Sequence, residues 1–379
     1  MPGWWRPSSM RPGRCAARPS RKASRMPPED SMGVDSQPPA TFQEPLPIGS
    51  WREIADGIFR LSIPVPFRGL RQVNLWLIRD GSGWTMVDCG WGDQETRDLI
   101  TAAWDDILGG RPVTRLVVTH FHPDHMGNCA WIASHWNLLP HVTQTEWMAA
   151  NLAVRNLYSD DVETRARFFV QNGLSEELLQ VFHDGVILYH RGVDLPEQFC
   201  RLRDGEDLRI DGRDWRIITG AGHSPEMATL YDRARDIYLA GDQILPKITS
   251  NVSVWPWEPL ADPLYDFLTS LERIATIVPD SAIVLPSHRD PFRGPRRRVA
   301  ELKAHHAHRL EVLKADMRRQ GEASAGACLA ALFQGTLDGH QVAFAMAEAL
   351  AHLNYLVRRG EAERIERSDG SVRFKLIED

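Results

Sequence analysis

The sequence predicts an α/β (α+β) protein whose main part is layered as helix, sheet, sheet and helix, followed by a smaller C-terminal module. Short strand-like runs alternate with amphipathic helical runs twice, once on each side of a helical stretch at residues 141–190. His and Asp residues follow the ends of strands in both halves, which indicates two βα halves packed sheet against sheet. Residues 297–379 instead show three helical runs and a hairpin pattern, so we expect a separate module there.

The first half begins at Trp51, after a segment with a different composition. Residues 1–46 are rich in Pro, Ser and Arg and almost free of aliphatic side chains, so we expect a disordered tail. Short β-like runs, a Gly-rich turn and an amphipathic run that ends at two glycines predict strands and then a helix, before a further strand and a helix start. These elements are expected at residues 57–63, 73–78, 84–89, 94–108, 115–118 and 128–135.

Residues 119–127 follow a strand and gather three imidazoles and one carboxylate within six positions. Alternate side chains of an extended segment point the same way, so His120 and His122 can face one metal ion. Asp124 and His125 lie on the turn that follows and can face a second ion. A strand that ends in such a cluster presents it at the rim of a sheet, where a ligand can reach it. We therefore interpret this stretch as a metal site.

The second half repeats this arrangement with single residues. Its strands are expected at residues 208–210, 215–219, 229–231, 236–242 and 282–288. His223 lies in a Gly-rich turn after one of them, and Asp242 and His288 end two others. Asp88 ends a strand of the first half in the same way. It is equally consistent with a carboxylate that holds an imidazole in place and with an ordinary turn former.

The residue types indicate the chemistry. Imidazoles and carboxylates suit Zn²⁺, with Mn²⁺ or Fe as alternatives. Two such ions close together share a hydroxide, because coordination lowers the pKa of water from roughly 15.7 to about 7, and this hydroxide attacks a carbonyl or phosphoryl centre. Asp124 could orient the nucleophile or accept its proton. Asn251, Trp255 and Trp257, shortly after Asp242, are candidate substrate contacts.

Composition and charge argue against several classes of function. The five cysteines are odd in number, scattered and never in a Cys-x-x-Cys pair, so we expect free thiols in a cytoplasmic protein. No apolar run approaches the roughly 20 residues of a membrane-spanning helix, so no membrane partner is expected. Residues 1–30 carry a net charge of +5 and residues 296–379 carry +2, which leaves −13 for residues 31–295. This acidic segment disfavours nucleic acid and favours a small-molecule substrate, while a homo-oligomer stays open.

The C-terminal part has three helical runs followed by a hairpin with an Asp-Gly turn, expected at residues 299–319, 324–333, 341–359 and 361–377. This order matches a winged-helix module, a fold that often binds DNA. The hairpin carries four basic residues, but a segment charge of +2 is a weak electrostatic footprint for nucleic acid.

The order His-x-His-x-Asp-His, then a distant His, Asp and His, closely resembles the signature of the metallo-β-lactamase superfamily. The resemblance covers about residues 50–295 and implies a four-layered αββα sandwich as the catalytic domain, at residues 47–296. It also implies two Zn²⁺ ions with the following ligands: His120, His122 and His223 for one, Asp124, His125 and His288 for the other, and Asp242 as the bridge.

The chain is also similar to a subgroup with a C-terminal winged-helix domain, because residues 248–256 follow Asp242 as they do in that subgroup. The similarity implies that residues 297–379 pack on the catalytic domain and border the substrate cleft. One departure is Glu226-Met227, where many relatives have Gly-His. This difference could alter the turn beside His223.

Together these inferences predict a binuclear zinc-dependent hydrolase that uses a metal-bridging hydroxide on an ester, thioester or lactone of a small molecule. A metal-dependent nuclease or phosphodiesterase acting on RNA or DNA is the first alternative, and the acidic segment disfavours it. A non-catalytic DNA-binding regulator with a vestigial metal site is the second, and the complete set of seven ligand positions argues against it. Ligand type alone also leaves an iron-dependent oxygenase or oxidoreductase open.

Overall fold

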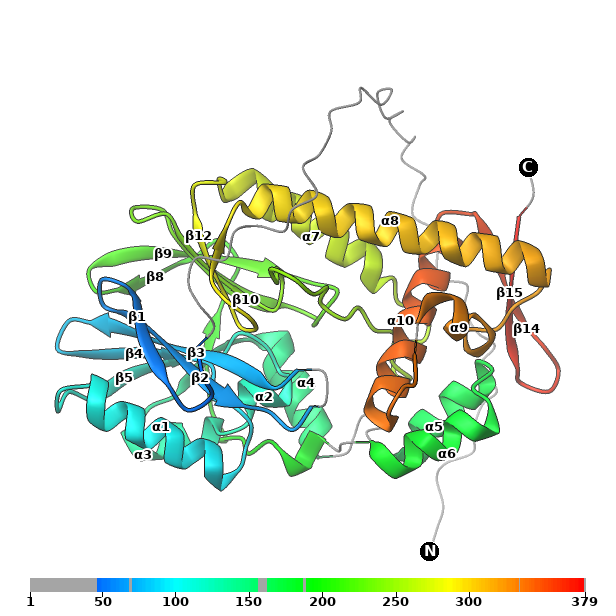
Figure 1. Ribbon diagram of the computed structural model, residues 1–379. Helices are drawn as coiled ribbons and strands as arrows, with labels where there is room; N and C mark the ends of the chain where they lie inside the picture. The colour runs from blue at the N-terminus through cyan, green and yellow to red at the C-terminus, as the bar shows by residue number, and fades with distance from the viewer. Residues whose placement is uncertain (1–45, 68–69, 156–161, 187–188, 334, 378–379) are drawn as a thin grey trace, which may run out of the picture. The chain divides into compact units, whose positions relative to one another are not determined.

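Two β-sheets lie at the centre of the protein, and helices cover their outer faces (Figure 1). This computed structural model describes residues 46–67, 70–155, 162–186, 189–333 and 335–377, which belong to one compact unit. The tail predicted at residues 1–46 lies outside the described residues, apart from Leu46.

The first sheet has seven strands in the order β1 to β7. The first four form an antiparallel meander, and β4 to β7 then run parallel. Parallel neighbours require long crossover connections, which is why helices follow these strands. The strands are β1 (Trp51–Ala55), β2 (Ile58–Pro64), β3 (Gln72–Asp80), β4 (Gly83–Val87), β5 (Val113–Val117), β6 (Pro140–Thr143) and β7 (Cys200–Leu202).

The second sheet has six strands in the order β13, β12, β11, β10, β9 and β8. The strands from β8 to β11 are antiparallel neighbours, whereas β11 and β12 are parallel and are connected through helix α7 (Pro263–Ile277). The strands are β8 (Asp207–Ile210), β9 (Arg213–Gly220), β10 (Met227–Asp232), β11 (Ile237–Gly241), β12 (Ile283–Pro286) and β13 (Phe292–Arg293).

Buried apolar side chains, among them Trp76 and Leu239, hold the two sheets face to face. Helices α1 (Gln94–Ile107) and α3 (Cys129–Trp136) pack on the first sheet through a second core. Helix α7 and the long helix α8 (Pro295–Gln320) share a third core with residues of the second sheet (Figure 1). The order helix, sheet, sheet, helix confirms the predicted fold class.

Polar caps explain where several helices begin. Asp93 caps α1 and Asp262 caps α7, each through a side-chain oxygen that accepts a backbone N–H of the first turn. Pro263 occupies the first position of α7, where its missing N–H costs nothing. Asp338 and Gln341 form a reciprocal capping box at the start of helix α10 (Gly339–Arg358).

Several elements differ from the sequence-based expectation, and the short strands β7 and β13 have no counterpart in it. Residues 140–143 form strand β6, although the helical stretch was expected from residue 141. This strand pairs with β5 and β7, and its four residues are too few for an alternation pattern to reveal it. Helix α7 is absent from the prediction, although its buried side chains follow helical spacing at Leu264, Phe267, Leu271 and Ile274. Among the described residues, the rest of the stretch contains α4 (Gln144–Val154), α5 (Val162–Gln171), α6 (Glu176–Gly185) and the 3₁₀ turn η1 (Tyr189–Arg191).

The C-terminal module has the expected order of three helices and a hairpin. Helix α8 comes first, a 3₁₀ turn η2 (Gly326–Cys328) and the short helix α9 (Leu329–Leu332) follow, and α10 is the third. The hairpin consists of β14 (Ala362–Glu366) and β15 (Val372–Leu376). Among the residues that the structure describes, none of the helices combines the length and apolar character that a membrane crossing requires.

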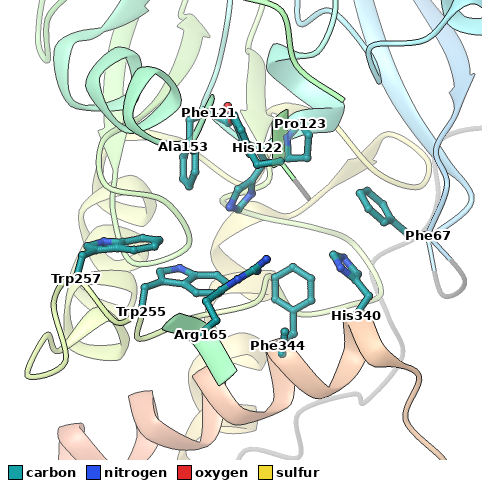
Figure 2. A pocket seen from close by; sticks show the side chains of 12 residues that line it. Phe67, Phe121, His122, Pro123, Ala153, Arg165, Trp255, Trp257, His340 and Phe344 are labelled. Carbon is teal, nitrogen blue, oxygen red and sulfur yellow. The ribbon is translucent and has the colours of Figure 1, made fainter. Parts of the chain in front are cut away.

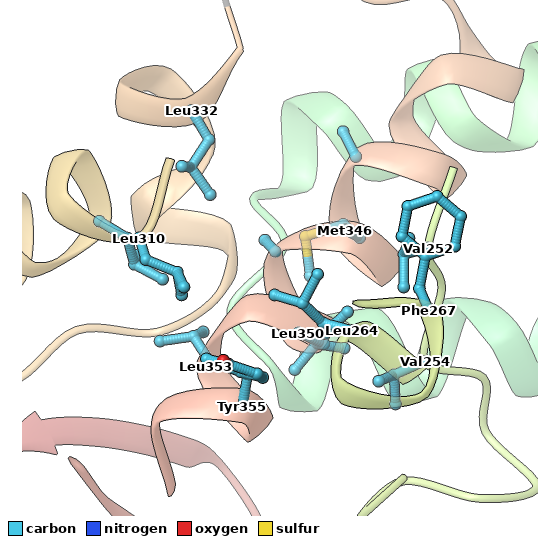
Figure 3. Packing of buried hydrophobic residues seen from close by; sticks show 14 of the residues in the cluster. Val252, Val254, Leu264, Phe267, Leu310, Leu332, Met346, Leu350, Leu353 and Tyr355 are labelled. Carbon is cyan, nitrogen blue, oxygen red and sulfur yellow. The ribbon is translucent and has the colours of Figure 1, made fainter. Parts of the chain in front are cut away.

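One core joins this module to the second sheet and α7 (Figure 3). Leu310 of α8 and Leu350 and Leu353 of α10 belong to the same buried cluster as Leu264 and Phe267 of α7. The domain boundary between residues 296 and 297 stays a prediction, because α8 begins at residue 295 and the core runs across the boundary.

Leu350→Ala is expected to lower the free energy of unfolding of the catalytic part as well as the module. Leu350 is 2% exposed, and removing its side chain leaves a cavity in the shared core that costs about 2–5 kcal/mol. Leu350→Met nearly conserves volume and should cost less than about 1.5 kcal/mol. None of the 13 tryptophans lies in residues 297–379, and 11 of them lie in residues 47–296, so a urea transition in tryptophan fluorescence reports on the catalytic part and not on the module. An unchanged fluorescence transition in Leu350→Ala would contradict the shared core.

Candidate metal centre

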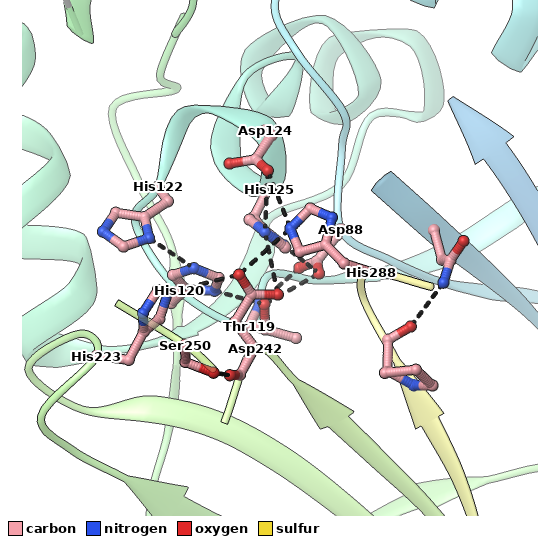
Figure 4. A network of polar contacts seen from close by, with 12 residues as sticks. Asp88, Thr119, His120, His122, Asp124, His125, His223, Asp242, Ser250 and His288 are labelled. Carbon is pink, nitrogen blue, oxygen red and sulfur yellow. Dashed lines mark hydrogen bonds and ion pairs between the residues drawn. The ribbon is translucent and has the colours of Figure 1, made fainter. Parts of the chain in front are cut away.

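Five strand ends deliver the predicted polar side chains to one place (Figure 4). Strands β4, β5, β9, β11 and β12 each end a few residues before a His or Asp residue. The strands themselves are buried in apolar cores, so the polar His and Asp side chains lie in the loops that follow them. The structure brings together His120, His122, Asp124, His125, His223, Asp242 and His288.

Two groups of donor atoms lie on either side of this cluster. The ligand atoms of His120, His122 and His223 lie within 4.8 Å of one another, and His120 Nε2 is 3.0 Å from His122 Nδ1. In the other group, Asp124 Oδ2 is 3.3 Å from the Nε2 atom of His288 and 3.5 Å from that of His125. The two groups have the composition that the sequence predicts for two metal ions. Their role as metal ligands stays a prediction.

Asp242 lies between the two groups. Its Oδ2 atom is 3.5 Å from His223 Nε2 and 3.3 Å from His288 Nε2, and its Oδ1 atom is 3.7 Å from His125 Nε2. One carboxylate therefore faces imidazoles of both groups, which is the placement that a bridging ligand needs.

Four atoms in the cluster are buried without a hydrogen-bond partner among the described residues: His125 Nε2, His223 Nε2, His288 Nε2 and Asp242 Oδ1. An unsatisfied buried polar group costs about 1–3 kcal/mol, and native proteins contain few of them. These atoms point at one another from separate segments of the chain (Figure 4). Nitrogen and carboxylate donors in this arrangement fit divalent cations of the zinc type.

The protein groups also compensate one another's charge. Burial lowers the pKa of His125, but the carboxylates of Asp124, Asp88 and Asp242 outweigh burial and hold this pKa well above its usual value. Burial likewise lowers the pKa of His288, and Asp242 and Asp124 overcome it and raise the pKa to about 10. A metal ion would displace these protons, since a coordinating imidazole is neutral.

Hydrogen bonds from the far side of the imidazole rings fix their orientation. Asp88 Oδ2 accepts the Nδ1 proton of His125 at 2.8 Å, and the backbone oxygens of Asn251 and Gln72 do the same for His223 at 2.7 Å and His288 at 2.9 Å. Each Nε2 atom is thereby left to face the cluster.

Asp88 combines the two roles that the sequence left open. It contacts His125, and its Oδ1 atom accepts the backbone N–H of Thr119 at 2.8 Å. It also turns the chain after β4, with a φ of 65° that is uncommon for a non-glycine residue. Thr119, which the sequence analysis did not single out, places its hydroxyl 3.0 Å from His120 Nδ1.

Glu146 of helix α4 is a second residue that the sequence analysis missed. One of its oxygens accepts the backbone N–H of Phe121 at 2.9 Å and the other accepts that of Glu226 at 2.6 Å. It therefore connects the loop of His120 and His122 with the loop of His223. Burial raises its pKa to about 7, although these hydrogen bonds act in the opposite direction.

The departure at Glu226 belongs to the same arrangement. The Thr143 hydroxyl donates to the backbone oxygen of Glu226 at 2.8 Å, and the Thr145 N–H donates to its carboxylate at 3.2 Å. The spacing from Thr143 to Glu146 resembles a capping box, and this was the available signal. In the structure the Glu146 carboxylate accepts hydrogen bonds from two other loops and not from its own helix start, so the capping-box motif alone could not have revealed its role.

The predicted substrate contacts line two pockets beside the cluster. A pocket of about 310 Å³ is lined by Asn251 and by five cluster residues, His122, Asp124, His223, Asp242 and His288. A more apolar pocket adjoins it, since Phe67 and Phe344 line both (Figure 2). Trp255 and Trp257 line the apolar pocket and stack on each other with ring centroids 5.5 Å apart.

Helix α10 contributes a wall to both pockets. His340 and Phe344 project from it, and the ring of His340 stacks on Phe67 at 4.9 Å between centroids (Figure 2). Arg165 of α5 also lines the apolar pocket. The sequence analysis predicted that this module borders a cleft but named none of these residues, because no local pattern indicates a neighbour so distant in the chain.

Residues 68–288 match the family model described as "Metallo-beta-lactamase superfamily", and residues 310–377 match the one described as "Metallo-beta-lactamase-like, C-terminal domain". The fold is similar to the crystal structure of a beta-lactamase domain protein from Burkholderia ambifaria, with a TM-score of 0.81 and 39% identity over 90% of this chain and 98% of that chain. These matches support a C-terminal module of metallo-β-lactamase-like proteins, whereas its winged-helix class stays a prediction.

Two curated relatives are more distant. The chain is 25% identical to the acyl-coenzyme A thioesterase MBLAC2 of Gallus gallus over 232 residues, which cover 59% of this chain and 75% of that protein. It is 25% identical over 123 residues, 32% of this chain, to an uncharacterized protein of Aquifex aeolicus (strain VF5), and it spans about half (56%) of that protein's length.

In the absence of metal, the free energy of unfolding of the wild-type protein is expected to depend on pH through Glu146, and Glu146→Gln is expected to remove this dependence. The folded state holds a proton on Glu146 up to a pKa of about 7, whereas the unfolded chain releases it near 4.5. The contribution of Glu146 to the free energy of unfolding is therefore fully present below about pH 4.5. It is lost as the pH rises towards 7, by at most about 1.4 kcal/mol per pH unit.

The measurement is chemical denaturation at several pH values in the presence of a chelator. The exposed Glu363→Gln serves as the control. Parallel pH profiles for wild type and Glu146→Gln would contradict the expectation, whatever the offset between them.

Proposed function

The chain belongs to the metallo-β-lactamase superfamily and is a metal-dependent hydrolase, and we propose that it is a binuclear zinc enzyme that cleaves acyl thioesters or related esters and lactones of small molecules. The observation that carries the proposal is the set of buried, unsatisfied imidazole and carboxylate atoms at the wall of an apolar pocket. The printed name of the MBLAC2 relative supports the choice of thioesters first.

The residues would divide the work as follows. His120, His122 and His223 would hold one ion, Asp124, His125 and His288 would hold the other, and Asp242 would contribute to both. Two bound divalent ions would supply Lewis acidity and an activated water.

Asp124 also lines the pocket. Burial raises its pKa, but the imidazoles of His125 and His288 outweigh burial and hold the pKa well below its usual value, so Asp124 is ionised. As a carboxylate, it would orient the water and pass its proton on. Water's oxygen would join the acyl carbon, the carbon–sulfur bond would break, and the thiol would leave with the proton that Asp124 carried.

The apolar pocket supports an acyl group as the bound part of the substrate. Aromatic rings from four segments surround it, at Phe67, Phe121, Trp255 and Phe344. Such a lining excludes water and favours an apolar group next to the reacting carbonyl.

For residues 297–379 we propose a winged helix that completes the substrate cleft. Two of the four basic residues of the hairpin are already paired, Arg364 with Glu366 and Arg367 with Glu322. This pairing leaves little excess positive charge for a phosphate backbone, so it supports the small-molecule reading over a nuclease or a DNA-binding regulator.

Purified protein is expected to contain about two Zn per chain and to hydrolyse acyl thioesters. Chelation should abolish the activity and added Zn²⁺ should restore it. Asp124→Asn should lower kcat/KM by about 10²–10⁴-fold, because it loses the proton acceptor. The assay panel contains acyl thioesters, lactones and bis-p-nitrophenyl phosphate. Turnover of the phosphodiester alone would favour the phosphodiesterase alternative, and iron with oxygen consumption would favour an oxidoreductase.

Phe344→Ala is expected to shift acyl preference towards longer or bulkier groups, because it enlarges the apolar pocket from the α10 side. The expected change in the ratio of kcat/KM values between a long and a short acyl thioester is about 10-fold or more, which corresponds to one or two buried methylenes. Phe344→Leu keeps most of the volume and is the matched control. An equal decrease in kcat/KM for all acyl chain lengths would indicate that Phe344 does not limit the length of the acyl group.

A further inference from the structure

Helix α10 of the C-terminal module holds the loop that follows Asp242. The side-chain amide of Asn251 donates to Glu348 Oε2 at 3.2 Å, and the backbone N–H of Val254 donates to the oxygen of Ala347 at 3.1 Å. Two adjacent residues of α10 therefore fix two positions of one short loop.

The same loop contacts the metal centre from behind. The backbone oxygen of Asn251 accepts the Nδ1 proton of His223 at 2.7 Å. The Ser250 hydroxyl donates to the backbone oxygen of Asp242, and the Ser253 hydroxyl donates to the side-chain oxygen of Asn251. Both polar ends of the Asn251 side chain are thus engaged within the protein.

Glu348 is itself fixed by the module. It is 9% exposed, and its Oε1 atom lies 3.3 Å from Nη2 of Arg309 on α8. Arg309 also donates to the backbone oxygen of Leu332 at 2.8 Å. A buried carboxylate with a cation on one side and an amide on the other has little freedom to move.

We infer that Glu348 is a positioning residue for the metal centre, which acts through Asn251 on the ring of His223. This inference rests on the proposed binuclear function. The carbonyl of Asn251 selects the tautomer of His223 that carries its proton on Nδ1, and it sets the direction of the Nε2 lone pair. The C-terminal module is then part of the scaffold of one metal site.

The inference predicts a selective effect. His223 belongs to the group with His120 and His122, whereas His125 and His288 are held by Asp88 and by the backbone of Gln72. Loss of Glu348 should therefore lower the affinity for one metal ion and leave the affinity for the other unchanged.

The experiment uses the full chain, stripped by chelation and titrated with Co²⁺, whose visible spectrum reports the ligand set, and with Zn²⁺ in calorimetry. Glu348→Ala is expected to reduce the affinity of one metal equivalent by about 10–100-fold and to change the spectrum of that equivalent. The affinity for the second equivalent should stay within about twofold of the wild-type value. Glu348→Gln can still accept a hydrogen bond from Asn251, so its affinity for the first equivalent should lie between those of wild type and Glu348→Ala.

Two further variants separate positioning from stability. Asn251→Ala cuts the link to Glu348 but keeps the backbone oxygen, and it should reproduce the selective loss even where Glu348→Ala folds poorly. Asp316→Asn removes a buried carboxylate of the same module that pairs with Arg319 and Gln320, and it should lower the melting temperature without changing either affinity.

Unchanged affinities in both Glu348→Ala and Asn251→Ala, with wild type still binding two ions, would overturn the inference and leave the proposed function intact. Equal weakening of both ions, or the same loss in Asp316→Asn, would also overturn it. Wild-type protein that binds no Co²⁺ or Zn²⁺ would overturn the proposed function and the inference with it.

Discussion

The close approach of seven mutually facing imidazoles and carboxylates, five of them buried and two partly buried, is the constraint on which the rest of the structure depends. Four of their atoms have no hydrogen-bond partner among the described residues. The sheets and their packed helices fix the backbone of the segments that carry these residues. Asp124 faces the imidazole of His125, and Asp242 faces that of His288, so opposite charges lie together. A divalent cation would supply the compensation that these atoms still lack, which is why the geometry points to metal chemistry.

The sequence was sufficient for the parts of this arrangement that are local. His120, His122, Asp124 and His125 occur together after one strand, and the strands that carry His223, Asp242 and His288 have clear β patterns. The two-sheet fold followed from the same alternation. The predicted bounds of most elements agree with the structure to within a few residues, because apolar periodicity and capping residues mark them directly.

The parts that the sequence could not reveal depend on contacts between distant segments. Glu146 and Glu348 look like ordinary helix-surface acids, and only the fold buries them against Phe121, Glu226 and Asn251. Strand β6 is too short to show an alternation, so only its two neighbours in the sheet define it. A sequence pattern describes which face of an element is apolar, but it does not describe which polar group will be enclosed by another element.

The division between local and distant contacts has a consequence for specificity. The metal-facing residues sit on strand ends that two sheet cores hold in place, whereas the pocket walls come from the segment with Phe67, the loop with Trp255 and helix α10. Walls of this kind can change without disturbing the cluster, so the fold can keep its hydrolytic chemistry while the bound substrate varies. Helix α10 is the exception, because it both lines the pocket through Phe344 and holds the Asn251 loop through Glu348. Substrate fit and metal geometry therefore meet in this one helix, and a substitution that tilts it would affect both at once.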